Sequence, residues 1–371
     1  MDNNKIKPEW IPEGGGREYA SRVVKGVSTE EKQEKAPIVP RSPRRRRLNV
    51  SDYVEGVLSR NRTVIAQAIT LVESNHPAHM ELAQQVLKAL LPYTGKSIRI
   101  GISGVPGAGK STLIENFGTM LCNQGNQVAV LAVDPSSSIT GGSILGDKTR
   151  MEELSRNPNA FIRPSATGGT LGGVNRKTRE TMLICEAAGY DVIIVETVGV
   201  GQNEVTVRSM VDFFLLIMLT GGGDELQGIK KGIMELADAI FVNKADGENK
   251  QRALAAKSEF NRILHFLHPI TEGWAPKAYI CSAFTGEGMA EMWQLINDFK
   301  EKTTVSGVFG RRRQKQTLDW MYTMVEDYLR SSFYNNSEIK RMLPGIETVV
   351  LNGEISATMA AKQLLKTYED H

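Results

Sequence analysis

The sequence predicts an α/β fold in which a mostly parallel β-sheet is flanked by helices on both sides. Between residues 97 and 300, short apolar runs of strand length alternate with helical patterns. Several of these runs, such as the one at 192–195, are apolar throughout, which is typical of strands buried on both faces of a parallel sheet. The expected strands cover residues 97–103, 127–133, 160–165, 191–197, 213–219, 238–243 and 277–282.

Helical patterns precede and follow this alternating region. From Val50 to about Tyr93, apolar residues recur at the i, i+3 and i+4 spacing of amphipathic helices, which predicts a small helical cap ahead of the sheet. Helical spacing returns from about Gly310, where the apolar positions form two stripes. The first stripe consists of Leu318, Met321, Val325 and Leu329, and the second of Ala357, Ala360, Ala361, Leu364 and Leu365.

These patterns divide the chain into four parts. Residues 1–48 are expected to be a disordered basic extension, and 49–95 an N-terminal helical segment. Residues 96–305 are expected to form the α/β domain. The helical arm at 306–371 is too small to be an independent domain, so its apolar stripes are expected to pack on the body or on another subunit.

Composition predicts a cytoplasmic protein. Hydrophobic residues make up 41% of the 371 residues and charged residues 23%, both ordinary for a globular chain. No apolar run approaches the roughly 20 residues that span a bilayer, so no membrane partner is expected. The N-terminus lacks the apolar core of a signal peptide. The three widely spaced cysteines indicate buried thiols in a reducing compartment.

Basic charge is concentrated in the N-terminal extension, while the rest of the chain is slightly acidic. The arginine run at 44–47 has the charge to contact nucleic acid or an acidic partner. No periodic or aromatic-interleaved surface accompanies it, which favours a solvated tail. We therefore expect no nucleic-acid partner.

Residues 104–111 form a complete G-x-x-x-x-G-K-S motif between a predicted strand and a predicted helix. In that setting the glycines let backbone N–H groups turn towards phosphate oxygens, and the helix N-terminus favours the same anion. Lys110 is expected to reach the β- and γ-phosphates, and the Ser111 hydroxyl to hold Mg²⁺. The sequence thus predicts a P-loop NTPase. Its candidate phosphate-binding residues are Gly104, Val105, Pro106, Gly107, Ala108, Gly109, Lys110, Ser111 and Thr112.

A second motif predicts that the nucleotide is GTP or GDP. Asn243, Lys244 and Asp246 form an N-K-x-D element at a strand end, similar to the guanine-reading element of GTPases. The Asp246 carboxylate can accept hydrogen bonds from N1 and N2 of guanine, a pair that adenine does not offer. Ser282 and Ala283, at the next strand end, suit the loop whose backbone N–H meets guanine O6. In isolation, N-K-x-D would more often be a surface turn; its order after a phosphate loop favours the guanine site.

Acidic residues near the ends of predicted strands are candidates for metal and water chemistry. Asp134 and Glu196 each follow a very apolar strand, and Asp147 lies in a loop. We expect Asp134 and Asp147 to hold Mg²⁺ or its waters and Glu196 to be the second acidic element beside the γ-phosphate. Gly199 is expected to sense the γ-phosphate through its backbone N–H. The alternative for each of these three acids is a role as a helix cap or as a surface loop residue.

A glycine-rich loop at 221–232 follows another predicted strand. If this loop moves towards the phosphates, Gln227 and Lys230 are expected to orient the attacking water and to stabilise charge in the transition state. The candidate catalytic residues are therefore Lys110, Asp134, Glu196, Gln227 and Lys230. Taken alone, the segment would only indicate a mobile loop.

Together these motifs closely resemble the MeaB/ArgK family of P-loop GTPases, which belongs to the metallochaperone-like group. The resemblance covers about residues 50–370 and departs only in the basic extension. The segments that carry it are 104–111, 133–137, 141–151, 196–202, 223–232 and 243–246.

The resemblance implies a chaperone of an adenosylcobalamin-dependent acyl-CoA mutase of the methylmalonyl-CoA mutase type. Hydrolysis of GTP would gate cofactor loading and protect or reactivate the mutase, with its adenosyltransferase as a further partner. The loop at 221–232 would be a switch that couples the mutase to hydrolysis, and the C-terminal helices would be a homodimerisation arm. The chain has no D-x-H-x-x-G cobalamin motif, so the partners are expected to carry the cobalamin.

Two other functions stay open at this point. Relatives have been described as kinases serving basic-amino-acid (lysine, arginine, ornithine) transport, although no phosphoacceptor pocket is evident and N-K-x-D argues against ATP. A nickel metallochaperone of the same group would carry histidine tracts or paired Cys and His ligands. His265 and His268 have i, i+3 spacing, but no cysteine or third histidine is near them in sequence, so a metal site is not expected.

Overall fold

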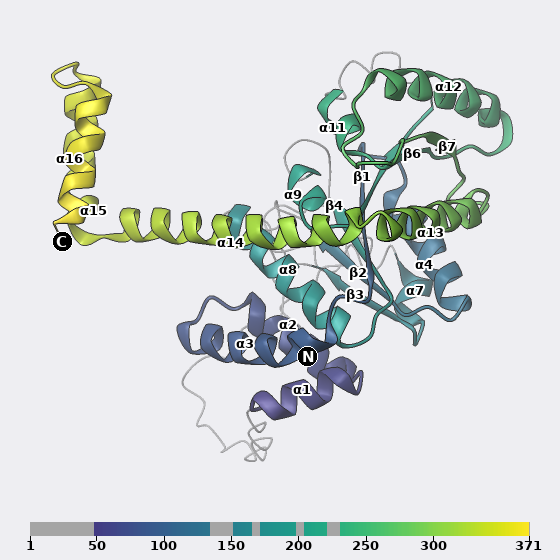
Figure 1. The fold of residues 1–371 in the computed structure, drawn as a ribbon, viewed down its shortest axis with the longest axis horizontal. Coiled ribbons are helices and arrows are strands. Elements are labelled where there is room, and N and C mark those ends of the chain that lie inside the picture. The colour runs from purple at the N-terminus through teal and green to yellow at the C-terminus, as the bar shows by residue number, and fades with distance from the viewer. Residues whose placement is uncertain (1–47, 134–150, 165–170, 198–203, 221–230, 371) are drawn as a thin grey trace, which may run out of the picture. The chain divides into compact units, whose positions relative to one another are not determined.

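A seven-stranded sheet in the order β3-β2-β4-β1-β5-β6-β7 lies at the centre of the fold, with helices on both of its faces (Figure 1). The computed structural model describes residues 48–133, 151–164, 171–197, 204–220 and 231–370. Every strand pairs in parallel with its neighbours. The strands are β1 Ile98–Gly104, β2 Val128–Val133, β3 Ala160–Pro164, β4 Val192–Thr197, β5 Phe213–Met218, β6 Ala239–Val242 and β7 Ala278–Ile280. The predicted parallel sheet is confirmed, and its strands nearly coincide with the predicted ranges.

Side chains that alternate along each strand feed two separate hydrophobic cores. Phe213 belongs to the core that α4 (Lys110–Asn123), α7 (Glu152–Arg156) and α13 (Met289–Val305) cover. Phe214 belongs to the core on the opposite face. Because both faces are covered, β4, β5 and β6 are buried at every position. This explains why β5 and β6 are apolar throughout and why β4 is apolar from Val192 to Val195.

The opposite face is covered by α8 (Leu171–Ala187), α9 (Glu204–Arg208), α11 (Lys231–Leu236) and α12 (Lys250–Phe266). The 3-10 turn η2 (Gly247–Asn249) precedes α12. Helix α12 ends before His268, so the His265 and His268 pair does not share a helix. Among the described residues, no group of three or more His, Cys, Asp or Glu side chains is arranged to hold a metal ion.

The predicted N-terminal cap consists of α1 (Val50–Leu58), α2 (Arg62–Glu73), α3 (Pro77–Leu90) and the 3-10 turn η1 (Leu91–Tyr93). A capping box between Asn49 and Asp52 begins α1, and Pro77 occupies the first position of α3. All three helices pack against α8, so the cap extends the core on that face of the sheet.

The C-terminal region consists of α14 (Val308–Asn335), α15 (Ser337–Leu351) and α16 (Ala357–Glu369). The expected apolar stripe on α14 does not pack on the body of this chain. Its members Leu318, Met321, Val325 and Leu329 are 54, 43, 50 and 55% exposed. Of the second stripe, Ala360 is buried, and α16 packs against α15.

The first turns of α14 are anchored by buried charge pairs. Arg313 forms a bidentate pair with Asp212, with Nη2···Oδ2 at 2.6 Å and Nε···Oδ1 at 2.8 Å. Arg312 donates to Thr271 Oγ1, and Thr271 in turn donates to Asp238. Asp212 and Asp238 directly precede β5 and β6, so α14 is anchored at the amino ends of these strands.

No helix of the described segments is long and apolar enough to cross a membrane.

Candidate nucleotide-binding site

The predicted motifs converge on the carboxyl edge of the sheet. Strand β1 lies between β4 and β5, where the strand order reverses, and in such sheets ligands bind at the carboxyl ends of the strands. Gly104 ends β1, Glu196 lies at the end of β4, and Asn243 directly follows β6. The candidate phosphate, metal and base residues are therefore neighbours in space, although they are far apart in sequence.

Close approach of the backbone explains the two outer glycines of the phosphate loop. A Cβ on Gly104 would lie 2.2 Å from the carbonyl oxygen of Ile217 on β5. Gly109 has a φ of 81° and a Cβ there would lie 2.7 Å from the amide nitrogen of Asn243. Side chains at these positions would push the loop away from β5 and β6. Helix α4 then starts at Lys110, so its free N–H groups face the loop.

Lys110 is folded back onto the loop. Its Nζ donates to the carbonyl oxygens of Gly104 at 2.8 Å and Val105 at 3.3 Å. Burial lowers the pKa of Lys110, and the nearby carboxylates of Glu196 and Glu204 act in the opposite direction. The Lys110 amine is thus buried at the start of the phosphate loop, where an anionic ligand would stabilise its charged form.

Ser111 and Glu196, two of the candidate metal residues, are in direct contact. The Ser111 hydroxyl donates to Glu196 Oε1 at 3.1 Å, and Glu196 is 5% exposed. A hydroxyl and a carboxylate beside a phosphate site are the oxygen donors that Mg²⁺ takes, directly or through its waters. These two residues therefore fit the expected ion. Asp134 and Asp147, the other expected ligands, lie outside the described residues.

Asn243 ties the base-reading motif to the phosphate loop. Its side-chain amide donates to the carbonyl oxygen of Ala108 at 2.7 Å, and its Oδ1 accepts from the backbone N–H of Ala283 at 2.9 Å. Asn243 is 1% exposed. Asn243 thus braces the phosphate loop against the loops that follow β6 and β7.

Asp246 and Ser282 are also in contact. The Ser282 hydroxyl donates to Asp246 Oδ2 at 2.6 Å, which orients the carboxylate. Asp246 is half-buried, whereas Ser282 and Ala283 are buried. Lys244 is exposed and has a left-handed backbone conformation with a φ of 60°. The two loops with candidate guanine-binding residues therefore lie side by side.

Three residues at the site were not singled out from the sequence. The Asn116 amide of α4 donates to the carbonyl of Ala283. Asn249 donates to the carbonyl of Lys244 at 2.7 Å. Glu204, 3% exposed, contributes to the electrostatic environment of Lys110. Only Glu204 has a sequence signal, because it closely follows the E-T-V-G segment that begins at Glu196.

Gly199, Gln227 and Lys230 lie outside the described residues, as do Asp134 and Asp147. The helices that follow the segments 198–203 and 221–230 are α9 and α11, and these two pack against each other. The roles expected for those five residues stay predictions.

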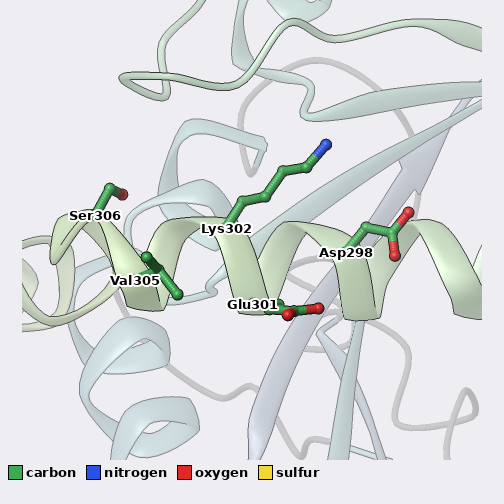
Figure 2. A pocket seen from close by; sticks show the side chains of 5 residues that line it. All are labelled: Asp298, Glu301, Lys302, Val305 and Ser306. Atoms are coloured by element: carbon green, nitrogen blue, oxygen red, sulfur yellow. The ribbon is translucent and has the colours of Figure 1, made fainter.

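A cavity of about 390 Å³ lies elsewhere, along the second half of α13 (Figure 2). Lys302 Nζ lies 5.5 Å from the centroid of the Trp274 ring. None of the motif residues lines this cavity, so it is separate from the candidate nucleotide site. It is lined by Asp298, Glu301, Lys302, Val305 and Ser306.

The parallel sheet, its phosphate loop and the adjoining N-K-x-D element define the chain as a P-loop GTPase. It belongs to the family described as "Methylmalonyl Co-A mutase-associated GTPase MeaB", whose model matches residues 65–338. The enzyme hydrolyses GTP to GDP and phosphate.

Known proteins resemble the chain over most of its length. The GTPase ArgK of Escherichia coli (strain K12) is 48% identical over 303 residues, which cover 82% of this chain and 92% of the relative. The mouse "Methylmalonic aciduria type A homolog, mitochondrial" is 46% identical over 324 residues, covering 85% and 78%. A solved structure of an "LAO/AO transport system kinase" matches with a TM-score of 0.72 at 38% identity, covering 87% of this chain and all of that one.

Proposed function

We propose that this GTPase is a chaperone of an adenosylcobalamin-dependent acyl-CoA mutase of the methylmalonyl-CoA mutase type. Its hydrolysis of GTP would gate cofactor loading and protect or reactivate the mutase. The single observation that carries the proposal is membership of a family described by its association with methylmalonyl-CoA mutase. The mouse relative, named for methylmalonic aciduria, supports the same link. An adenosyltransferase that supplies the cofactor is the second proposed partner.

In the proposed mechanism, three groups of residues bind the phosphates, the guanine base and Mg²⁺. The backbone of residues 104–112 and the Lys110 amine bind the phosphates, and Asn243, Lys244, Asp246, Ser282 and Ala283 bind guanine. Ser111 and Glu196 would hold Mg²⁺ together with Asp134 and Asp147. When bound, the ion would neutralise charge that develops on the phosphate oxygens.

Three residues of the proposed mechanism respond to the γ-phosphate. Gly199 senses it, while Gln227 and Lys230 orient the attacking water and stabilise transition-state charge. If these residues reach the site only when a partner is bound, intrinsic turnover is slow and the mutase accelerates it. Hydrolysis then acts as a timing signal for the partner.

We also propose that the enzyme is a homodimer held by α14. The apolar stripe that begins at Leu318 and Met321 is exposed in the single chain, and its helical spacing places its members on one face. A second copy offers a matching apolar surface. Sedimentation of Leu318→Asp/Val325→Asp tests this: the double variant is expected to be monomeric, and an unchanged mass would exclude this face.

The test of the chaperone proposal is the rate of GTP hydrolysis with and without a purified adenosylcobalamin-dependent mutase. We expect acceleration that depends on mutase concentration. Lys110→Ala serves as the control for contaminating GTPases. A rate that is unchanged at saturating mutase would contradict the proposed coupling.

One observation favours a second function, namely the similarity to a structure named as an LAO/AO transport system kinase. A tagged chain used to capture partners from native cells separates the two functions. Recovery of an acyl-CoA mutase supports the chaperone, whereas recovery of a transport protein that becomes phosphorylated supports the kinase.

A further inference from the structure

We propose that Asn249 is a positioning residue that holds the N-K-x-D turn at residues 243–246 and links it, through Thr220, to the end of β5. Neither Asn249 nor Thr220 belongs to the phosphate loop or to the N-K-x-D element. The proposal rests on the proposed role of Asp246 in binding guanine, and its test separates the two assignments.

The turn contains a strained residue. Only two non-glycine residues in the described part of the chain have a positive φ, and Lys244 is one of them, at 60°. The left-handed conformation is unfavourable for an L-amino acid, because its Cβ comes close to the backbone carbonyl. Such a conformation persists where surrounding contacts hold it in place. The contacts of Lys244 therefore identify what maintains the turn.

The peptide group between Lys244 and Ala245 is held from both sides. Its carbonyl oxygen accepts from the Asn249 side-chain amide at 2.7 Å, and its N–H donates to the carbonyl oxygen of Cys281 at 3.0 Å. The backbone N–H of Asn249 also donates to the carbonyl oxygen of Asp246 at 3.1 Å. Asn249 thus bonds to the turn through both its side chain and its backbone.

Thr220 orients the Asn249 amide. Its hydroxyl donates to Asn249 Oδ1 at 2.8 Å. An amide offers an acceptor oxygen and a donor nitrogen, so a hydroxyl donor on one side and the Lys244 carbonyl on the other favour the same orientation. Thr220 lies two residues beyond Met218, where β5 ends, and the glycine-rich segment that begins at Gly221 follows directly.

A continuous hydrogen-bonded path therefore runs from Thr220 through Asn249 to Lys244. It would keep the N-K-x-D turn in its strained form before a base binds, which lowers the entropic cost of binding. Loss of the path is expected to weaken base binding. The phosphate loop keeps its own bond to Asn243, so phosphate binding is expected to be unaffected.

Calorimetric titration of the full chain with GDP and with inorganic tripolyphosphate tests the proposal. Asn249→Ala is expected to weaken GDP binding about tenfold and Thr220→Val about threefold, the range for loss of a hydrogen bond. Tripolyphosphate affinity is expected to be unchanged, because this ligand has no base. Thr220→Ser keeps the hydroxyl and is expected to retain native GDP affinity.

Thr348→Val is the matched control, because it also removes a threonine hydroxyl. Thr348 is exposed on α15, and its hydroxyl donates to the carbonyl oxygen of Pro344 at 2.9 Å. GDP affinity is expected to be native in this variant. A loss equal to that of Thr220→Val would overturn the assigned role of the Thr220 hydroxyl.

The double variant Thr220→Val/Asn249→Ala distinguishes a link from two independent effects. If Thr220 acts through Asn249, the double variant binds GDP as Asn249→Ala does. Multiplied losses of about thirtyfold would overturn the link. Native GDP affinity in Asn249→Ala would also overturn it, as would an equal loss of tripolyphosphate binding, which would show that the phosphate loop is disturbed.

The guanine assignment is judged separately with Asp246→Asn. If that variant leaves the ratio of GDP to XDP affinity unchanged, the guanine assignment fails. If the ratio shifts but Thr220→Val and Asn249→Ala bind GDP with native affinity, the link alone fails.

Discussion

Asn243 donates a 2.7 Å hydrogen bond to the carbonyl of Ala108, so the end of β6 is joined directly to the phosphate loop. The same side chain accepts from Ala283, at the loop that follows β7. One buried amide thus links the three loops to which phosphate and base are assigned. Because each bond is made inside the protein, the loops are positioned before a nucleotide binds. Nucleotide binding is therefore opposed by a smaller loss of loop conformational entropy.

Replacement of Lys110 by alanine is expected to reduce GTP turnover by at least about a hundredfold, because the phosphate site loses its charged donor. Phosphate release under saturating GTP measures the effect. Circular dichroism of the variant controls for folding. Native turnover in a folded variant would contradict the site assignment.

Asp246→Asn is expected to shift nucleotide preference from guanine towards xanthine. An amide presents a donor where the carboxylate presents only acceptors, and xanthine carries an acceptor oxygen where guanine carries its N2 amine. Competition between GDP and XDP measures the shift. We expect the ratio of affinities to change by about tenfold or more, as for loss of a charge-assisted pair. An unchanged ratio would remove Asp246 from base reading.

Arg313→Ala is expected to destabilise the fold by about 3–5 kcal/mol, because it leaves the Asp212 carboxylate buried without its partner. The side chain of Asp212 is 1% exposed and that of Arg313 is 16% exposed. Urea unfolding measures the difference. Arg311→Ala is the matched control, since its pair with Glu272 is 58% and 78% exposed and is expected to contribute less than about 1 kcal/mol. Equal effects at the two positions would show that the anchor is not the buried pair.

The three cysteines are expected to resist thiol reagents at pH 8 until the protein unfolds. Burial raises the pKa of Cys185 and of Cys281 to about 12, and also raises that of Cys122. Since a raised pKa depletes the thiolate, only about one part in ten thousand of a thiol with pKa 12 is ionised at this pH. Labelling with and without urea checks this, and rapid modification of the folded protein would refute it.

The sequence was sufficient to predict the sheet and the adjacency of its motifs, for a physical reason. Strands such as β5 are buried on both faces, so their sequences are apolar without interruption. Parallel strands bring their carboxyl ends to one edge, which is why Ser111 and Glu196 could be expected near each other and do meet at 3.1 Å.

Other contacts could not be predicted, because they pair residues that have no local pattern. Arg313 and Asp212 are 101 positions apart, and nothing in either segment identifies the partner. The contact of Asn116 with Ala283 is of the same kind. The stripe at Leu318 shows a different limit: periodicity indicates that one helix face is apolar, but not what covers it.

The anchor of α14 separates the surface proposed for dimerisation from the candidate nucleotide site. The anchored part of α14 ends near Gln316, which is 9% exposed and donates to the carbonyl of Val211. It is attached at the amino ends of the strands, opposite the candidate nucleotide site. Beyond that point the helix is free to change its surface residues, or even its partner, without a compensating change at the phosphate loop. Evolution can therefore vary how such molecules assemble while the GTP-hydrolysing machinery stays the same.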